Sequence, residues 1–295
     1  MNFDFNEEQT MIMDGIARYI REEYDFDRRR SIIESDSAYS DDVWRQFSEL
    51  GWLSIPFDES YGGFGGHADD LAGVMLELGK GLIIEPYMST VVVFGSLLNA
   101  SNNDSLKEQL IPRIINGQYK GSFAYAEEQS RFEISDVKTS AQKCGDGYKL
   151  NGTKIAVIDA KESDGLIVTA RTGGSQYGAE GISLFLVDTS AEGVAVSSYN
   201  TMDSHSSSTI NLENVFVTEA NLIVDEGEGF RHIESCLPQI LLCLSAEALG
   251  IMEVLNKLTV EYSKTRKQFG APIGSFQAVQ HRMVDNFMAF EQSKS

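Results

Sequence analysis

The chain has 295 residues, with 24 lysine and arginine residues against 44 aspartate and glutamate residues, so its formal net charge is −20. This length predicts about two domains, and 42% hydrophobic residues supply the apolar material for a sizeable core. The acidic balance argues against a nucleic-acid-binding surface or a patch for anionic membranes, because both need clustered Lys and Arg.

Cysteine usage and the start of the chain indicate the compartment. Cys144, Cys236 and Cys243 are scattered and form no C-x-x-C pair, which favours a reduced, cytoplasmic protein. The first residues lack a basic segment followed by an apolar one, so no secretory signal is expected. The two most apolar segments, around Val91 and Leu242, are interrupted by acidic residues, and we expect no membrane span.

The first third of the chain has helical patterns. Asn6 can cap a helix, because Gln9 stands three residues on at the spacing of a capping box. Ser40 or Asp41 opens another helix, which Gly51 closes.

Further helices complete this part of the chain. We expect Asp104 to cap the last of three helical segments, at about 68–80, 86–99 and 104–116. Together these patterns predict an N-terminal all-helical domain over residues 1–119.

Near Gly121 the pattern changes to the alternation of half-buried strands. Strand-like runs occur at 165–170, 182–187 and 215–217. Gly145–Gly147 and Asn151–Gly152 are predicted hairpin turns, because Gly and Asn tolerate positive φ. These features predict a central β-sandwich or barrel domain over residues 120–227.

The helical period returns at Gly229 and runs through Glu261, broken only by Pro238 near its start. Ser275 is expected to cap a final helix that still runs at Ser295. Residues 228–295 are therefore predicted to begin a helical-bundle domain whose last helices are missing. The helical, β, helical order predicts an α+β fold.

Several standard motifs are absent. The glycine-rich run at 62–66 follows no strand and lacks the spacing of a phosphate-binding loop. The four histidines are too far apart in the sequence to predict a metal site, and no G-x-S-x-G nucleophile turn is present.

The stretch from Arg266 to Gln277 is the most informative one. A helix ends near Arg266 and Phe269, a tight turn follows at Gly270, and a new helix begins with Gln277 in its first turn. An arginine can pair with a pyrophosphate, a phenylalanine can pack on an adenine, and a helix start favours anions. A plain helix–turn–helix corner is the alternative.

These residues resemble the acyl-CoA dehydrogenase family, whose signature R-x-x-F-G-x-x-I-x-x-F-Q matches 266–277. Further matches are Glu59–Gly63 to the P-E-x-x-G-G loop, Asn151–Lys154 to the N-G-x-K turn and Asn214–Val217 to the x-V-x-V-P segment. The likeness covers the whole chain in order. It implies a flavoprotein in which Arg266, Phe269 and Gln277 reach the adenosine-diphosphate half of a neighbouring subunit's FAD.

Two segments depart from the family pattern. The flavin loop T-E-P-G-x-G-S-D aligns with Ala126–Asp136, which lacks the glycines, is three residues longer and keeps Glu127, Ser135 and Asp136. The resemblance implies that Glu127 and Ser135 also bind FAD. The W-I-T segment beside the isoalloxazine aligns with Ala156–Ile158, which removes an aromatic ring and a hydroxyl.

The family's catalytic base is a glutamate that takes the α-proton of the acyl-CoA while a hydride leaves for the flavin. Most members carry it in C-terminal helices absent from this chain, and a minority carry it at the position of Ile240. The nearby acid is Glu247, which shares a helix face with Ile240 but lies ~10 Å along the axis. Glu247 is the candidate base, and a structural glutamate paired with an arginine is the alternative.

The groups that touch a neighbour's FAD are kept, whereas those that hold the chain's own isoalloxazine are lost. This resembles the small-subunit branch of the family, as in pimeloyl-CoA dehydrogenase small subunits and actinobacterial sterol side-chain dehydrogenases. It implies an FAD-dependent oxidation of an acyl-CoA to the 2,3-enoyl-CoA, with a larger subunit or a second copy as partner and an electron-transferring flavoprotein as acceptor. A non-catalytic assembly subunit and a truncated homotetrameric enzyme are the alternatives.

Overall fold

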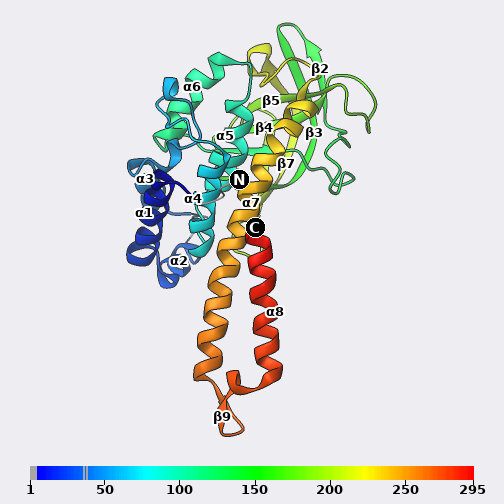
Figure 1. Cartoon of the computed structure of the whole chain (residues 1–295). Helices are drawn as coiled ribbons and strands as arrows, with labels where there is room; N and C mark the ends of the chain where they lie inside the picture. The colour runs from blue at the N-terminus through cyan, green and yellow to red at the C-terminus, as the bar shows by residue number, and fades with distance from the viewer. Residues whose placement is uncertain (1–4, 36, 38) are drawn as a thin grey trace. The chain divides into compact units, whose positions relative to one another are not determined.

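The computed structural model describes residues 5–35, 37 and 39–295 (Figure 1). The chain forms two compact units, each assembled from separated stretches of sequence. The first unit holds residues up to 29, 72–83 and 242–295, and the second holds residues 30–71 and 84–241. The three consecutive domains predicted from the sequence are a different division, and their boundaries stay a prediction.

The first unit is helical. It contains α1 (Glu7–Glu23), the start of α2 (Phe26–Ile33), most of α4 (Ala68–Lys80), the second part of α7 (Gly229–Thr265) and α8 (Gln277–Lys294). The predicted capping box of α1 is confirmed, because the backbone N–H of Gln9 donates to Asn6 and the backbone N–H of Asn6 donates to Gln9.

The end of α7 and α8 form an antiparallel hairpin (Figure 1). The connection between them contains β8 (Lys267–Gln268), β9 (Ala271–Pro272) and the 3-10 turn η6 (Ile273–Ser275). The predicted cap of the last helix is wrong, because Phe276 occupies the N-cap position and Ser275 donates to the carbonyl of Pro272. The predicted break at Pro238 is also wrong, since α7 continues through that residue.

Helices of the second unit follow the sequence pattern with two differences. Ser40 caps α3 (Asp41–Glu49), as predicted. The segment expected to be helical over 86–99 consists of a π-helix, η3 (Met88–Phe94), followed by α5 (Gly95–Asn99). Asn103 caps α6 (Asp104–Ile115), so the predicted cap is wrong by one residue. Short 3-10 turns are η1 (Trp52–Ser54), η2 (Glu59–Tyr61), η4 (Ala160–Glu162) and η5 (Glu219–Asn221).

The second unit also contains a seven-stranded mixed sheet. Its strands are β1 (Gly121–Ala124), β2 (Ser140–Cys144), β3 (Gly147–Ile158), β4 (Gly165–Arg171), β5 (Ile182–Asp188), β6 (Val194–Asn200) and β7 (Ser206–Thr218). The order is β1-β4-β2-β3-β7-β6, with β5 paired to β4. The predicted turn before β3 is confirmed, because Cys144 pairs with Gly147. Asn151–Gly152 is not a turn: it lies inside β3 at a register shift.

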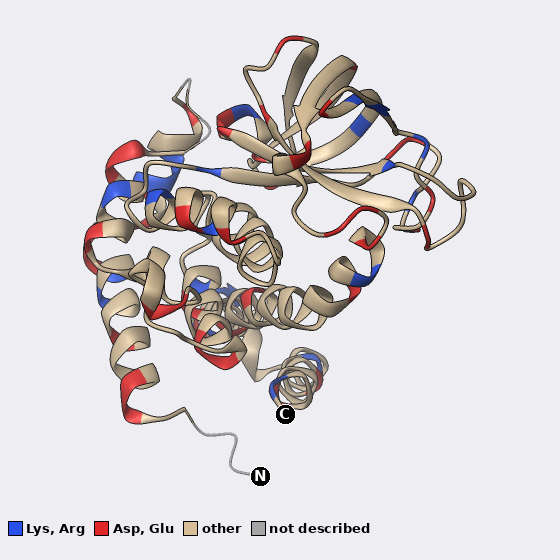
Figure 2. Ribbon diagram, turned by 90° about the horizontal axis from the view of Figure 1, so that it is seen from above, with Lys and Arg blue, Asp and Glu red and all other residues tan. Residues whose placement is uncertain are grey.

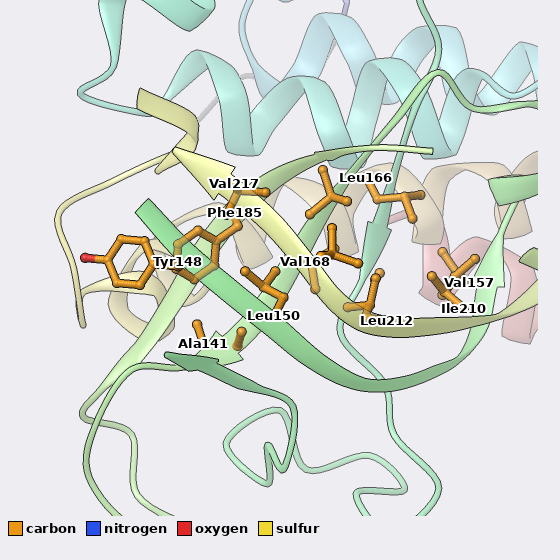
Figure 3. Close-up of a cluster of buried hydrophobic side chains, with 14 of the residues drawn as sticks. Ala141, Tyr148, Leu150, Val157, Leu166, Val168, Phe185, Ile210, Leu212 and Val217 are labelled. Carbon is orange, nitrogen blue, oxygen red and sulfur yellow. The ribbon is translucent and has the colours of Figure 1, made fainter. Parts of the chain in front are cut away.

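The hydrophobic core of the sheet is formed by alternate residues of several strands (Figure 3). Tyr148 on β3 and Phe185 on β5 pack with ring centroids 5.0 Å apart. Leu150 and Leu212 extend this cluster along β3 and β7. The fold is α+β, as the sequence predicted.

Acidic residues lie on helices and on loops of the sheet alike, with basic residues between them (Figure 2). By length and composition, α7 is apolar enough to cross a membrane. Core helices of water-soluble proteins meet the same criterion, so the expected absence of a span stays a prediction.

Candidate functional site

The loop that aligns with the family's flavin loop leaves the sheet between β1 and β2. Strand β1 pairs with β4 over Gly121–Ala124. Directly after β1, the carbonyl of Ala126 accepts a hydrogen bond of 2.9 Å from the backbone N–H of Ile155 on β3. Strand β2 then pairs with β3 over Ser140–Cys144, and with β4 at Ser140, which lies opposite Arg171. Both ends of the loop are therefore held by β3 and β4, and we call this place the neck of the loop.

Glu127 closes the neck. One carboxylate oxygen accepts hydrogen bonds from the Lys154 ammonium at 2.7 Å and from the backbone N–H of Thr139 at 3.0 Å. The other accepts from the backbone N–H of Lys138 at 2.8 Å and from the Gln129 amide at 2.9 Å. Burial opposes ionisation, but the Lys154 charge and these hydrogen bonds outweigh it and lower the pKa of Glu127 to about 2.

Lys154 is completely buried, with a side chain 0% exposed. Its ammonium also donates to the hydroxyl of Thr169 at 2.7 Å and to the carbonyl of Tyr125 at 3.3 Å. An ammonium has three donors, so all three are used. Burial lowers the pKa of Lys154 to about 8 against the opposing effect of Glu127, and the group keeps its charge at neutral pH.

A second cation, the half-buried Arg171, holds the far end of the loop. The guanidinium of Arg171 donates to backbone carbonyls at five positions, residues 135, 137, 176, 178 and 180. Ser135 is buried, and its hydroxyl donates to Glu133 at 2.8 Å. The contacts of Glu127 and Ser135 described here are thus made within the loop and its supports, and their binding of FAD stays a prediction.

The tip of the loop is exposed. Arg131 has a left-handed backbone with φ of 50°, and the Phe132 side chain is 98% exposed. A positive φ is uncommon for a residue other than glycine.

Strand β3 bends just past Lys154, where its pairing with β7 shifts register. Ala156 has φ of 51° and is exposed, Val157 is buried, and Ile158 is 53% exposed. The segment that aligns with W-I-T therefore presents two aliphatic side chains outward. Asp159 follows with φ of 56°, and its buried carboxylate accepts a hydrogen bond of 2.6 Å from the Ser89 hydroxyl of η3.

In the first unit, the tip of the α7–α8 hairpin carries the signature residues. Arg266, Phe269 and Gln277 are all exposed, and the ring of Phe269 is 94% exposed. The Phe269 and Phe276 rings meet edge to face with centroids 6.2 Å apart. The structure therefore brings the three residues to one exposed tip.

Glu247 lies on the part of α7 that belongs to the first unit and is half-buried. Its backbone packs directly on α4: a Cβ atom placed on Gly79 would lie 2.3 Å from the carbonyl oxygen of Glu247. This close contact between α4 and α7 fixes the backbone position of Glu247. The role of the Glu247 carboxylate as a base stays a prediction.

The sequence motif contained Lys154 but did not reveal its role. Lys154 is the last residue of the N-G-x-K match, and no local pattern distinguishes a completely buried lysine from an exposed strand residue. The one available signal was a lysine at a position where the alternation of β3 faces the core. Arg171, at the end of β4, gave no such signal.

Models of three acyl-CoA dehydrogenase domains match the chain in order: the N-terminal domain at residues 6–118, the middle domain at 122–215 and the C-terminal domain at 227–295. A probable acyl-CoA dehydrogenase, YngJ, from Bacillus subtilis is 31% identical over 100% of this chain and 78% of its own length.

Two solved structures resemble this one over nearly its full length. The FAD complex of PigA superposes with a TM-score of 0.91 at 27% identity, covering 99% of this chain and 77% of that one. A chain of the ChsE4–ChsE5 complex from Mycobacterium tuberculosis superposes with a TM-score of 0.88 at 26% identity, covering 99% and 76%.

Proposed function

Because the chain belongs to the acyl-CoA dehydrogenase family, we propose that it serves as one subunit of an FAD-dependent enzyme that oxidises an acyl-CoA to the 2,3-enoyl-CoA. The reaction removes two hydrogens from a CH–CH bond. The other subunit in this proposal is a larger acyl-CoA dehydrogenase chain. The similarity to a chain of the ChsE4–ChsE5 complex supports such an unlike pair.

One contrast carries this proposal. The tip residues Arg266, Phe269 and Gln277 are exposed, so they fit the adenosine-diphosphate half of an FAD on another subunit. The side chains of Glu127 and Ser135 instead make their contacts within their own loop and its supports, and Ala156–Ile158 presents aliphatic groups outward. In this proposal the side chains of Glu127 and Ser135 shape the loop, and do not bind the isoalloxazine directly as the family motif implies.

FAD supplies a hydride acceptor when it is bound. This chain's part in the chemistry would be to hold a proton acceptor, and Glu247 is the candidate. Its half-buried position on α7 leaves the carboxylate partly shielded from water, which is compatible with a proton acceptor. The packing of α4 against the backbone of Glu247 supports a fixed position for that group.

The flavin absorbance spectrum tests the shared pocket. The chain is purified alone and again after co-expression with a candidate larger subunit. We expect flavin only in the co-purified complex. Stoichiometric flavin on the chain alone would refute the two-subunit proposal and show that the loop Ala126–Asp136 holds FAD by itself.

Replacing Glu247 with Gln separates an enzymatic subunit from an assembly subunit. We expect Glu247→Gln to leave the flavin content of the complex unchanged and to abolish turnover of acyl-CoA. Glu261→Gln is the matched control, because Glu261 is exposed on the same helix and pairs with Lys264 one turn along. Full turnover by Glu247→Gln would favour the non-catalytic assembly role.

The electron acceptor and the compartment follow from the same proposal. By family resemblance, an electron-transferring flavoprotein would reoxidise the flavin. All three cysteines are free thiols in the structure, which supports a reducing, cytoplasmic setting.

A further inference from the structure

We propose that Lys154 is a positioning residue: through Glu127 it closes the neck of the loop Ala126–Asp136 and fixes the shape that this loop presents to the cofactor. The neck is formed by contacts within this chain and needs no cofactor, whereas its effect on the cofactor rests on the proposed function.

The geometry of the neck is the first step. Glu127 stands near the start of the loop, and the backbone N–H groups that it binds belong to Lys138 and Thr139 at the far end. One side chain thus ties together positions 11 and 12 residues apart. The carboxylate holds the loop closed only if both of its oxygens accept hydrogen bonds.

The charge of Lys154 is the second step. Glu127 has a side chain 4% exposed, and a buried carboxylate without a counter-charge is costly enough to take up a proton. A protonated carboxyl group has one O–H donor in place of part of its acceptor capacity. Its hydrogen bonds from Gln129, Lys138 and Thr139 are then weaker than those to a carboxylate, so removal of the ammonium weakens the neck.

The position of Lys154 in the sheet is the third step. Its ammonium contacts the carbonyl of Tyr125 just past β1, and Thr169 on β4, while its backbone belongs to β3. The register of β3 shifts directly after Lys154, at the start of the segment Ala156–Ile158, whose first and last residues are exposed. One cation therefore joins the loop to the strand that carries Ala156–Ile158, the segment aligned with the family's W-I-T.

Limited proteolysis of the full chain tests the neck without any flavin. Trypsin cleaves after Arg131, which is exposed at the loop tip, and the fragment ending there is measured by mass spectrometry at pH 7. We expect Lys154→Met to be cleaved at this bond at least about tenfold faster than the wild type, because a neutral Glu127 holds the neck with weaker hydrogen bonds and local opening becomes easier. Lys149→Met is the matched control, since Lys149 is exposed on the same strand, and its cleavage rate should stay unchanged.

Folding must be separated from positioning. Far-UV circular dichroism at the assay temperature identifies variants that remain folded. Glu127→Gln is the second variant, because it keeps the size of the side chain and removes the charge, and we expect the same faster cleavage. Cleavage of a folded Lys154→Met or Glu127→Gln at the control rate would overturn the proposal, and so would a rise matched by equal acceleration at tryptic sites elsewhere in the chain.

The flavin complex tests the consequence for the cofactor. When the co-purified complex contains FAD, we expect Lys154→Met to shift the flavin absorbance bands by several nanometres, while Lys149→Met leaves them in place. Unshifted bands in a complex with an opened neck would overturn the link to the cofactor. If the wild-type complex holds no flavin, the proposed function fails, and the proteolysis result still decides the role of Lys154 in the neck.

Discussion

The contact between α4 and α7 allows one substitution to be worked through from the structure. A Cβ atom on Gly250 would lie 2.0 Å from the carbonyl oxygen of Leu76 and 3.1 Å from the backbone nitrogen of Lys80. A comfortable carbon-to-oxygen contact is about 3.3–3.6 Å. Both neighbours are backbone atoms that cannot rotate away, so Gly250→Ala forces the helices apart by about 1 Å or more.

Two terms set the size of the effect. Overpacking of this kind costs about 1–3 kcal/mol, whereas alanine in a helix interior is more stable than glycine by about 0.5–1 kcal/mol. The net expectation is a loss of up to about 2.5 kcal/mol in the free energy of unfolding. Because Glu247 lies three residues before Gly250, we also expect the displacement to reduce turnover of the flavin-loaded complex.

Urea unfolding followed by circular dichroism measures the first effect. Gly15→Ala is the control, because Gly15 lies inside α1 and a Cβ atom there would meet nothing within 4 Å. It should be more stable than the wild type by about 0.5–1 kcal/mol. If Gly250→Ala matches or exceeds the stability of Gly15→Ala, the inferred helix contact is wrong.

Three further predictions concern titration, thiols and the hairpin tip. The pKa of Glu127 is lowered to about 2, from about 4.3 in the unfolded chain. The ionised Glu127 therefore stabilises the fold fully above about pH 4.3, and this stabilisation is lost as the pH falls from about 4.3 to about 2. Unfolding curves of Glu127→Gln should lack that part of the pH dependence. Burial raises the pKa of the Cys236 thiol, and it raises the pKa of the Cys243 thiol to about 12. We therefore expect the native chain to react with one equivalent of a thiol reagent, at Cys144, and the unfolded chain to react with three. Phe269→Ala should lower the FAD content of the complex without changing the unfolding of the chain, because its ring is 94% exposed.

The sequence predicted the first residue of a helix well where a capping side chain lies within one turn of that residue. The capping box at Asn6 and the cap at Ser40 are set by residues within one turn, so the sequence is sufficient. At the start of α6, adjacent Asn103 and Asp104 both have suitable side chains, and the pattern could not select between them. Asn151–Gly152 failed for a different reason: a bulge uses the same permissive backbone as a turn, and the choice depends on β7, where the backbone N–H of Asn214 donates to the Asn151 side chain.

The sequence predicted the exposed hairpin tip of the candidate site but not the buried contacts of Glu127. The hairpin tip is encoded within one contiguous stretch, so its exposed arrangement followed from the motif. The environment of Glu127 depends instead on a lysine 27 residues away and on a neck that exists only after the sheet has formed. The motif alone predicts cofactor binding for Glu127 and gives no sign that both of its oxygens accept hydrogen bonds from the chain itself.

This difference in hydrogen bonding gives a general reason to expect an incomplete flavin pocket. A polar group binds a ligand well when the ligand supplies partners that the free protein lacks. Both oxygens of Glu127 already accept two hydrogen bonds each in the free chain, so a ligand would have to displace contacts that hold the loop. Arg266 is exposed, and a pyrophosphate can bind its guanidinium without breaking the fold. In our proposal the exposed hairpin tip therefore completes a cofactor site on a neighbour, and binding of FAD by the chain's own loop stays a prediction.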